Sequence, residues 1–132
     1  MTEAEMRAIL PAKLELVWET VTDLTRWDWR TDLKALRVLP DGRFQEIPQN
    51  GPATMFTITR LEPMACYQFN MENDNIRGSW TGVFRPVPEG TEIVFTERVS
   101  PKKWWMAPFV KGYLKQQQRR YLADLRRGLG LD

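Results

Sequence analysis

The chain has 132 residues, of which 42% are hydrophobic and 27% charged, and its formal net charge is +2. This length suits one compact domain, and the composition excludes a disordered tail, a collagen-like chain and a membrane-embedded protein. The sequence holds no histidine, which excludes Ser-His-Asp and Cys-His catalysis and most zinc or iron sites, and a single cysteine, which excludes an internal disulfide. We therefore expect a cytoplasmic protein with no metal and no cofactor.

The first third of the chain predicts a strand, a helix and a loop. Weak alternation over Met6–Leu10 indicates an edge strand. Apolar residues at spacings of three and four over Lys13–Leu24 predict an amphipathic helix, with Pro11 in its first turn. The polar, tryptophan-rich segment Asp23–Asp32 indicates a loop, with a second short helix as the alternative.

From Leu36 to Val99 the apolar residues alternate with period two, and turn signals interrupt the pattern. Short strands joined by tight turns at regular spacing predict an antiparallel meander. The expected strands are Leu36–Leu39, Arg43–Pro48, Thr54–Leu61, Tyr67–Met71, Trp80–Phe84 and Ile93–Val99.

The end of the chain predicts a long helix from Pro108 to Arg127, with Gly128 as its stop. One arc of this helix is apolar and carries Gln117 near its middle; the arc comprises Phe109, Val110, Tyr113, Leu114, Tyr121 and Leu125. Such a helix buries its apolar face on the open face of the sheet. A twisted sheet curls around a helix of this kind and leaves space for a pocket.

Charge is uneven along the chain. Residues 1–101 hold 11 basic and 15 acidic side chains, whereas residues 102–132 hold 8 basic and 2 acidic ones. Lys111, Lys115, Arg119 and Arg126 lie opposite the apolar arc. We interpret them as the solvated face of the helix, and the alternative is a contact with an anionic partner.

Through seven segments and their order, the sequence resembles the START-related helix-grip superfamily (SRPBCC). Within that superfamily it resembles the small polyketide-cyclase-like branch. The segments are Pro11–Trp18, Thr22-Asp23, Trp27–Trp29, Asp41–Phe44, Thr57–Pro63, Gly78–Phe84 and Glu89–Val94. The resemblance implies one START-like domain over residues 1–132, of the α+β class, in which a curved antiparallel sheet of six to seven strands wraps around a long C-terminal helix. Members bind lipids, sterols, quinones or aromatic polyketides in a cavity, and some catalyse cyclisation or dehydration there.

The side chains expected around this cavity are Phe56, Ile58, Arg60, Tyr67, Phe69, Trp80, Phe95, Glu97, Phe109, Tyr113 and Gln117. Glu46, Glu97 and Arg60 are the candidate catalytic groups, because a desolvated carboxyl exchanges protons near neutral pH and a guanidinium stabilises an oxyanion. The alternatives are an Arg–Glu ion pair or solvated strand ends, since a register error of one residue turns every side chain outward.

Three functions remain open from the sequence. The first is binding of an apolar small molecule, the second is a cyclase or dehydratase, and the third is a partner protein at a membrane or macromolecular surface. Trp104 and Trp105, beside Lys102 and Lys103, favour peripheral membrane contact or a gate at the pocket mouth. We expect no membrane span, no sequence-specific nucleic acid, and a monomer or homodimer.

Overall fold

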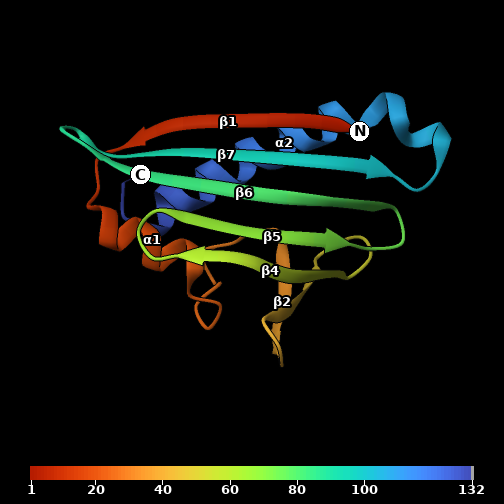
Figure 1. The fold of residues 1–132 in the computed structure, drawn as a ribbon, viewed down its shortest axis with the longest axis horizontal. Helices are drawn as coiled ribbons and strands as arrows, with labels where there is room; N and C mark the ends of the chain where they lie inside the picture. Colours follow the sequence, from red (N-terminus) through yellow and green to blue (C-terminus); the bar gives the residue numbers. More distant parts are fainter. Residues whose placement is uncertain (132) are drawn as a thin grey trace.

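The computed structural model describes residues 1–131 and places seven strands, two α-helices and one short 3-10 helix in them. The elements, in chain order, are β1 (Thr2–Leu10), α1 (Leu14–Thr22), β2 (Leu33–Leu39), β3 (Arg43–Pro48), β4 (Thr54–Glu62), β5 (Cys66–Glu72), β6 (Ile76–Val87), β7 (Gly90–Pro101), η1 (Trp104–Met106) and α2 (Ala107–Gly128) (Figure 1).

The strands form one antiparallel sheet in the order β1-β7-β6-β5-β4-β3-β2. Strands β2 to β7 are therefore a meander, and β1 pairs with β7 at the outer edge over all nine of its residues. The predicted sheet and its long terminal helix are confirmed, with β1 beginning at Thr2 rather than Met6.

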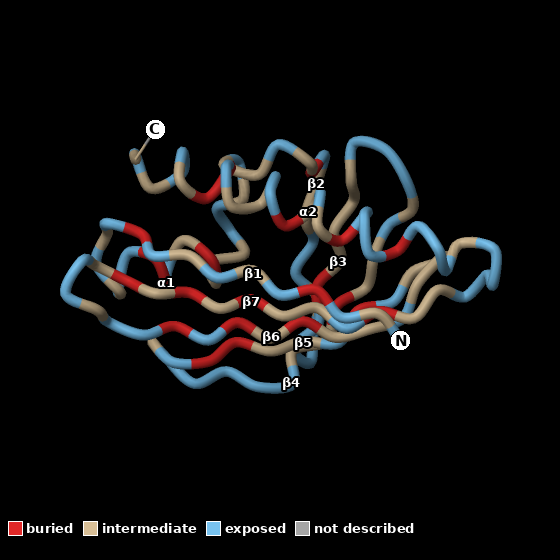
Figure 2. The backbone as a smooth tube through the Cα atoms, turned by 90° about the horizontal axis from the view of Figure 1, so that it is seen from above, coloured by how far each residue is buried: buried red, intermediate tan, exposed pale blue. Residues whose placement is uncertain are grey.

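The sheet and α2 face each other, and the buried residues lie mostly between them (Figure 2). Alternation along β7 shows how this arises, because Thr91, Ile93, Phe95 and Val99 are buried while the residues between them are not. These side chains meet α2 and α1, so one face of the sheet is covered by helices.

The buried face of α2 lies slightly to one side of the predicted arc. Pro108 occupies the first turn, as predicted, but the fully buried positions include Val110, Leu114 and Gln118 rather than Phe109 and Tyr113. Gln118, not Gln117, is the buried amide, and its Nε2 donates a hydrogen bond to the Ala4 carbonyl of β1 at 2.9 Å. Small errors of phase accumulate along a helix of 22 residues, which explains the shift.

Two of the lysines predicted on the solvated face also bind the edge strand. The Nζ of Lys115 donates to the Glu5 carbonyl at 2.7 Å, and the Nζ of Lys111 donates to the Glu3 carbonyl. Both carbonyls belong to β1, which has no strand on its other side within residues 1–131. The lysines therefore occupy acceptors that would otherwise be open to another strand.

The predicted helix ends differ in two places. Helix α1 begins at Leu14, so Pro11 lies in the preceding turn rather than in the helix. Helix α2 continues through Gly128, and the left-handed residue is Gly130, at φ +77°. Gly128 has another role, since a Cβ there would lie 2.8 Å from the Cβ of Trp29.

We expect Gly128→Ala to destabilise the protein by about 1–2 kcal/mol, because Trp29 must move out of its packed position. Gly112→Ala is the matched control on the same helix, because no other group lies within 4 Å of the place that its added methyl group would take. That change should stabilise the protein by about 0.5–1 kcal/mol through helix propensity alone. Urea denaturation of both variants measures the difference, and equal effects would contradict the close contact.

Candidate functional site

A cavity of about 590 Å³ lies between the concave face of the sheet, the α1–β2 loop and α2. Its volume is in the range of small-molecule sites. The wall is built mainly from apolar and aromatic side chains of β3 to β7, with polar groups from the loop and from α2. The described residues thus enclose a space that the side chains do not fill.

A row of aromatic rings crosses the cavity wall from strand to strand. Phe44 and Phe56 stack with centroids 4.8 Å apart, and Phe69 stacks on Trp80 at 4.9 Å. Edge contacts connect Phe56 to Phe69 at 5.0 Å, and a tilted contact connects Trp80 to Phe95 at 4.7 Å. The strand register places Phe44 opposite Phe56 and Phe69 opposite Trp80, and it makes the other two contacts diagonal ones, so the row follows from the antiparallel pairing.

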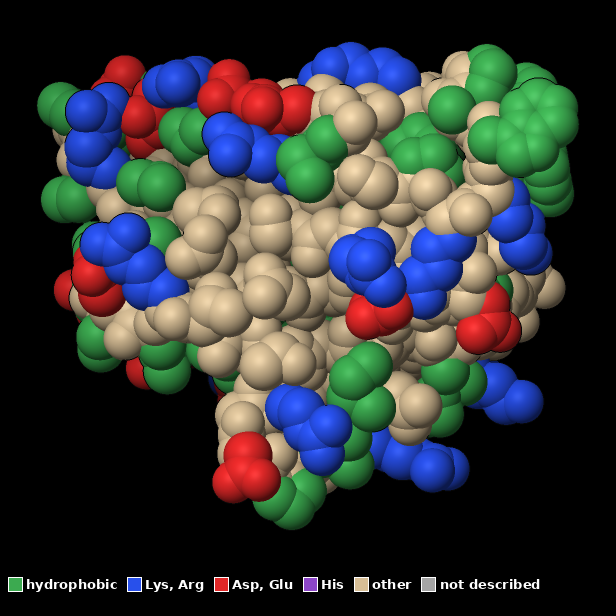
Figure 3. Space-filling view, turned by 45° about the vertical axis from the view of Figure 1, so that its right-hand side comes forward, with side chains coloured by type: hydrophobic (Ala, Val, Ile, Leu, Met, Phe, Trp, Pro, Cys, Tyr) green, Lys and Arg blue, Asp and Glu red, His purple; other side chains and the backbone are tan. Residues whose placement is uncertain are grey.

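Exposed aromatic side chains lie at the rim of the cavity. Trp105, Phe109 and Tyr113 line it while remaining more than half exposed, and the adjacent Trp104 is 86% exposed. Figure 3 shows hydrophobic side chains gathered at the upper right, over the end of the molecule where β7 passes into α2. Membrane contact by this rim stays a prediction. No helix among residues 1–131 is long and apolar enough to cross a bilayer.

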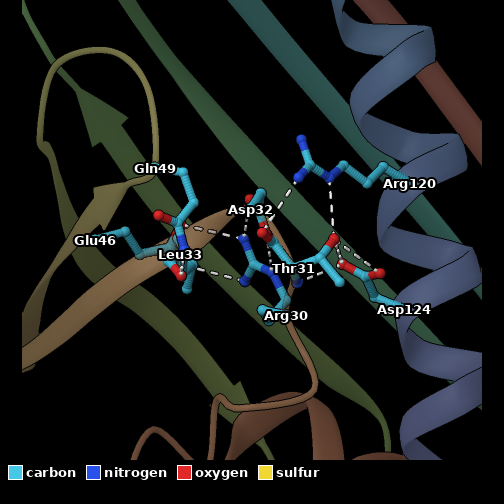
Figure 4. A network of polar contacts seen from close by, with 8 residues as sticks. All are labelled: Arg30, Thr31, Asp32, Leu33, Glu46, Gln49, Arg120 and Asp124. Atoms are coloured by element: carbon cyan, nitrogen blue, oxygen red, sulfur yellow. Dashed lines mark hydrogen bonds and ion pairs between the residues drawn. The ribbon is translucent and has the colours of Figure 1, made fainter.

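Arg30, from the α1–β2 loop, is held between two carboxylates (Figure 4). Its Nε and Nη2 donate to the two oxygens of Asp32, each at 2.9 Å, and its Nη1 and Nη2 donate to Glu46 at 3.3 Å. The guanidinium carbon also lies 5.0 Å from the centre of the Tyr121 ring. The hydrogen bonds and the ring together fix this buried side chain in one orientation.

The two carboxylates respond differently to Arg30. Burial acts to raise the pKa of Asp32, but the hydrogen bonds and charge of Arg30 outweigh it, so this pKa is lowered. The pKa of Glu46 is raised, because its deeper burial outweighs the longer contacts with Arg30. Arg30 and Asp32 therefore form a structural ion pair, whereas the carboxyl of Glu46 is poorly solvated.

Glu97 on β7 is a cavity carboxyl without a fixed partner. It is directly opposite Trp80 on β6 and Ala4 on β1, and it lies between Phe95 and Val99 on its own strand face. No hydrogen bond or ion pair joins it to any other residue in the described part of the chain. Burial, reinforced by the charge of Glu46 and opposed by that of Arg30, raises the pKa of Glu97 to about 7. It is thus close to half-protonated at neutral pH.

We expect Glu97 to make the free energy of unfolding fall as pH rises from about 4.5 to 7. Over this window the folded protein binds more protons than the unfolded chain, so each increase in pH favours unfolding. The loss is about 2–3 kcal/mol, at ~1.4 kcal/mol for each unit of pKa difference. Urea denaturation at pH 5 and pH 8 measures it.

Glu97→Gln is the control for this effect, because an amide stays neutral at both pH values. Glu46 also has a raised pKa and contributes with the same sign, so only the difference between wild type and Glu97→Gln belongs to Glu97. A difference that is equal at pH 5 and pH 8 would show that Glu97 titrates normally.

A second polar network joins the α1–β2 loop to α2. Asp124 of α2 is buried and accepts hydrogen bonds from the Thr31 backbone N–H at 2.8 Å and the Thr31 hydroxyl at 2.9 Å. Arg127 Nη2 donates to its other oxygen at 2.9 Å, and Arg120 Nε donates to the Thr31 hydroxyl oxygen at 3.1 Å. The residue next to Arg30 is therefore fastened to α2 (Figure 4).

Most of the side chains named from the sequence reach this cavity. The ones that line it are Glu46, Phe56, Tyr67, Phe69, Trp80, Phe95, Glu97, Phe109, Tyr113 and Gln117. Tyr67 is buried among aromatic rings, and its hydroxyl has no hydrogen-bond partner in residues 1–131. Ligand contact by any of these groups stays a prediction.

Arg60 and Ile58 do not line the cavity. The pairing of β4 with β5 shifts register between these two residues, so the alternation that predicted an inward Arg60 is broken there. Arg60 is exposed and its Nε donates to Glu62 at 2.8 Å. Ile58 packs against the core outside the cavity. The catalytic candidates in the cavity are thus reduced to the two glutamates.

Sequence reasoning did not find Arg30, Asp32, Asp124 or Tyr121 as site residues. The first two lie in a loop without periodicity, and a lone aspartate on a basic helix normally faces solvent. Within residues 1–131, no group of three or more acidic or cysteine side chains is placed to hold a metal ion.

A family model described as "Polyketide cyclase / dehydrase and lipid transport" matches residues 1–130. The chain belongs to this family. No curated protein matches it. Among solved structures, a START superfamily protein from Mycobacterium smegmatis is similar with a TM-score of 0.88 and 12% identity, over 97% of each chain.

Two further structures place other relatives on the same fold. A conserved protein from Geobacillus kaustophilus has a TM-score of 0.80 and 14% identity, covering 97% of this chain and 93% of its own. DynU16, a protein in the dynemicin biosynthetic locus, has a TM-score of 0.77 and 17% identity, covering 97% of this chain and 47% of its own. At these identities the likeness establishes the helix-grip fold of the family.

Proposed function

We propose that this protein binds a hydrophobic small molecule in the cavity between the sheet and α2. The observation that carries the proposal is the unfilled space of about 590 Å³ behind a continuous aromatic row. Apolar surface facing such a space is stabilised when an apolar ligand replaces water there. Membership of a family described by polyketide cyclases and lipid transport supports the same class of ligand.

A thermal-shift and calorimetric screen with fatty acids, amines, quinones and polycyclic aromatics tests the proposal. Ligand at about 100 times its Kd stabilises the folded protein by about 2.7 kcal/mol, which is a shift of several degrees. Leu36→Trp places a large ring in the cavity wall and should abolish binding. Val83→Trp adds the same ring at an exposed position on β6 and should leave binding intact. Equal binding by both variants would place the ligand elsewhere.

A second candidate function is a cyclase or dehydratase, and the specific observation that favours it is Glu97. A carboxyl without a partner, in an apolar cavity and with a pKa of about 7, is suited to accept and return a proton at neutral pH. Cyclisation of a reactive chain needs little beyond folding of the substrate and one proton transfer. Arg30 does not supply an oxyanion site, because its donors are already bound to Asp32 and Glu46.

Once a turned-over substrate is found, Glu97→Gln separates the two functions. If Glu97 is the acid or base, kcat falls by about 100- to 10,000-fold. If kcat is unchanged, Glu97 takes no part in catalysis.

A further inference from the structure

Two of the three cations that line the cavity are paired with carboxylates of the protein, and the third binds neutral acceptors. Arg26 pairs with Asp23 at 3.2 Å, and Arg30 is shared by Asp32 and Glu46. Arg120 donates to the hydroxyl and the carbonyl of Thr31 at 3.1 and 3.2 Å. Among the lining residues of the described chain, Glu97 is the charged group without a hydrogen bond or ion pair.

The cation nearest in effect to Glu97 is Arg30, which is already occupied. Four N–H donors of Arg30 are in use, and the Tyr121 ring covers one face of its guanidinium. To pair with Arg30, a ligand carboxylate would have to displace Asp32 or Glu46, and it would lie near the carboxyl of Glu97. Both changes bring like charges together in a poorly solvated space, which is costly.

The surroundings of Glu97 instead suit a cation. Trp80 lies directly across from it, and Phe95 is its neighbour on the same strand face. On α2, burial and the charge of Glu97 raise the pKa of Tyr113. The faces of aromatic rings attract ammonium groups, most strongly where water is excluded. A carboxylate beside such rings completes a site for a protonated amine.

We infer that the ligand of this cavity is a hydrophobic amine, whose protonated nitrogen pairs with the carboxylate of Glu97 while its apolar body lies along the aromatic row. The inference rests on the proposed ligand-binding function and specifies its ligand class. The raised pKa of Glu97 is consistent with it, because burial and the charge of Glu46 outweigh the charge of Arg30, and a bound ammonium would add the missing compensation.

Three fluorescent probes that share one ring system test the inference: 1-pyrenemethylamine, 1-pyrenemethanol and 1-pyreneacetic acid. For wild-type protein at pH 8, we expect the amine to bind at least about tenfold more tightly than the alcohol, a difference of about 1.4 kcal/mol. The acid should bind at least about tenfold more weakly than the alcohol, since its carboxylate meets those of Glu97 and Glu46.

Glu97→Gln should reduce the affinity for the amine to that for the alcohol and leave the affinity for the alcohol unchanged. The matched control is Glu62→Gln, which removes an exposed carboxylate outside the cavity. It should change neither the affinity for the amine nor that for the alcohol. If Glu97→Gln fails to fold, the order of the three probe affinities for the wild-type protein still tests the inference.

Equal binding of amine and alcohol, or tightest binding of the acid, would overturn the amine inference and leave the proposed function standing. Absence of binding by all three probes, together with a failed ligand screen, would overturn the proposed function as well.

Discussion

Arg30→Met is expected to lower the free energy of unfolding by about 3–5 kcal/mol at pH 8, because it leaves two buried carboxylates without their cation. Methionine keeps much of the apolar bulk, so the loss reports mainly on charge. The side chains of Arg30, Asp32 and Glu46 are each less than 20% exposed, so water cannot replace the missing guanidinium. Urea denaturation measures the loss.

Arg60→Met is the matched control, since Arg60 makes an ion pair with Glu62 in which both side chains are about half exposed. Exposed pairs of this kind contribute about 0–1 kcal/mol. The loss in Arg30→Met should also be smaller at pH 5 than at pH 8. Without Arg30 the pKa of Glu46 rises further, so the folded protein gains protons over this range and lowering the pH relieves the repulsion.

Arg30→Met combined with Glu46→Gln should recover part of the loss, because one of the two unpaired charges is then absent. A loss in Arg30→Met as small as that in Arg60→Met would show that the buried ion pair does not stabilise the fold.

The fold could be predicted because its signals are redundant. Each strand of the meander carries several alternating residues and a turn at each end, so an error at one position does not change the assignment. The aromatic row could be predicted for the same reason, since Phe56, Phe69, Trp80 and Phe95 each lie in phase with their own strand. Period-two patterns fix a face wherever the pleat is unbroken.

The polar part of the cavity could be predicted only in part, because single residues decide it. One register shift in β4 turned Arg60 outward, and one residue of helix phase made Gln118 the buried amide, although Gln117 lines the cavity as well. Arg30 lies in a loop, where no periodicity tells which side chain is buried. Its role emerges only when the folded chain brings Glu46, sixteen residues away, against it.

Asp124 shows the same limit on a helix, and it leads to the second large effect. Its carboxylate accepts hydrogen bonds from three donors, which are the Thr31 N–H, the Thr31 hydroxyl and Arg127 Nη2, and it is only 3% exposed. Asp124→Ala removes the charged acceptor of the Thr31 N–H and hydroxyl. Hydrogen bonds to a charged group contribute about 1.5–3 kcal/mol each, so we expect a total loss of about 3–4 kcal/mol.

The loss of stability should be local as well as global, because Asp124 holds the loop that carries Arg30 against α2. Hydrogen exchange should accelerate at Thr31 and the adjacent loop before it does in β6 and β7, and probe affinity should fall with it.

Thr31→Val removes the hydroxyl and keeps the backbone N–H bond, so it should cost only about 1 kcal/mol. Asp74→Ala, an exposed aspartate in the β5–β6 turn, is the control and should cost less than about 0.5 kcal/mol. If Asp124→Ala behaves like Asp74→Ala, the cavity wall is held by the aromatic packing of Trp29 and Tyr121 rather than by this hydrogen-bond network.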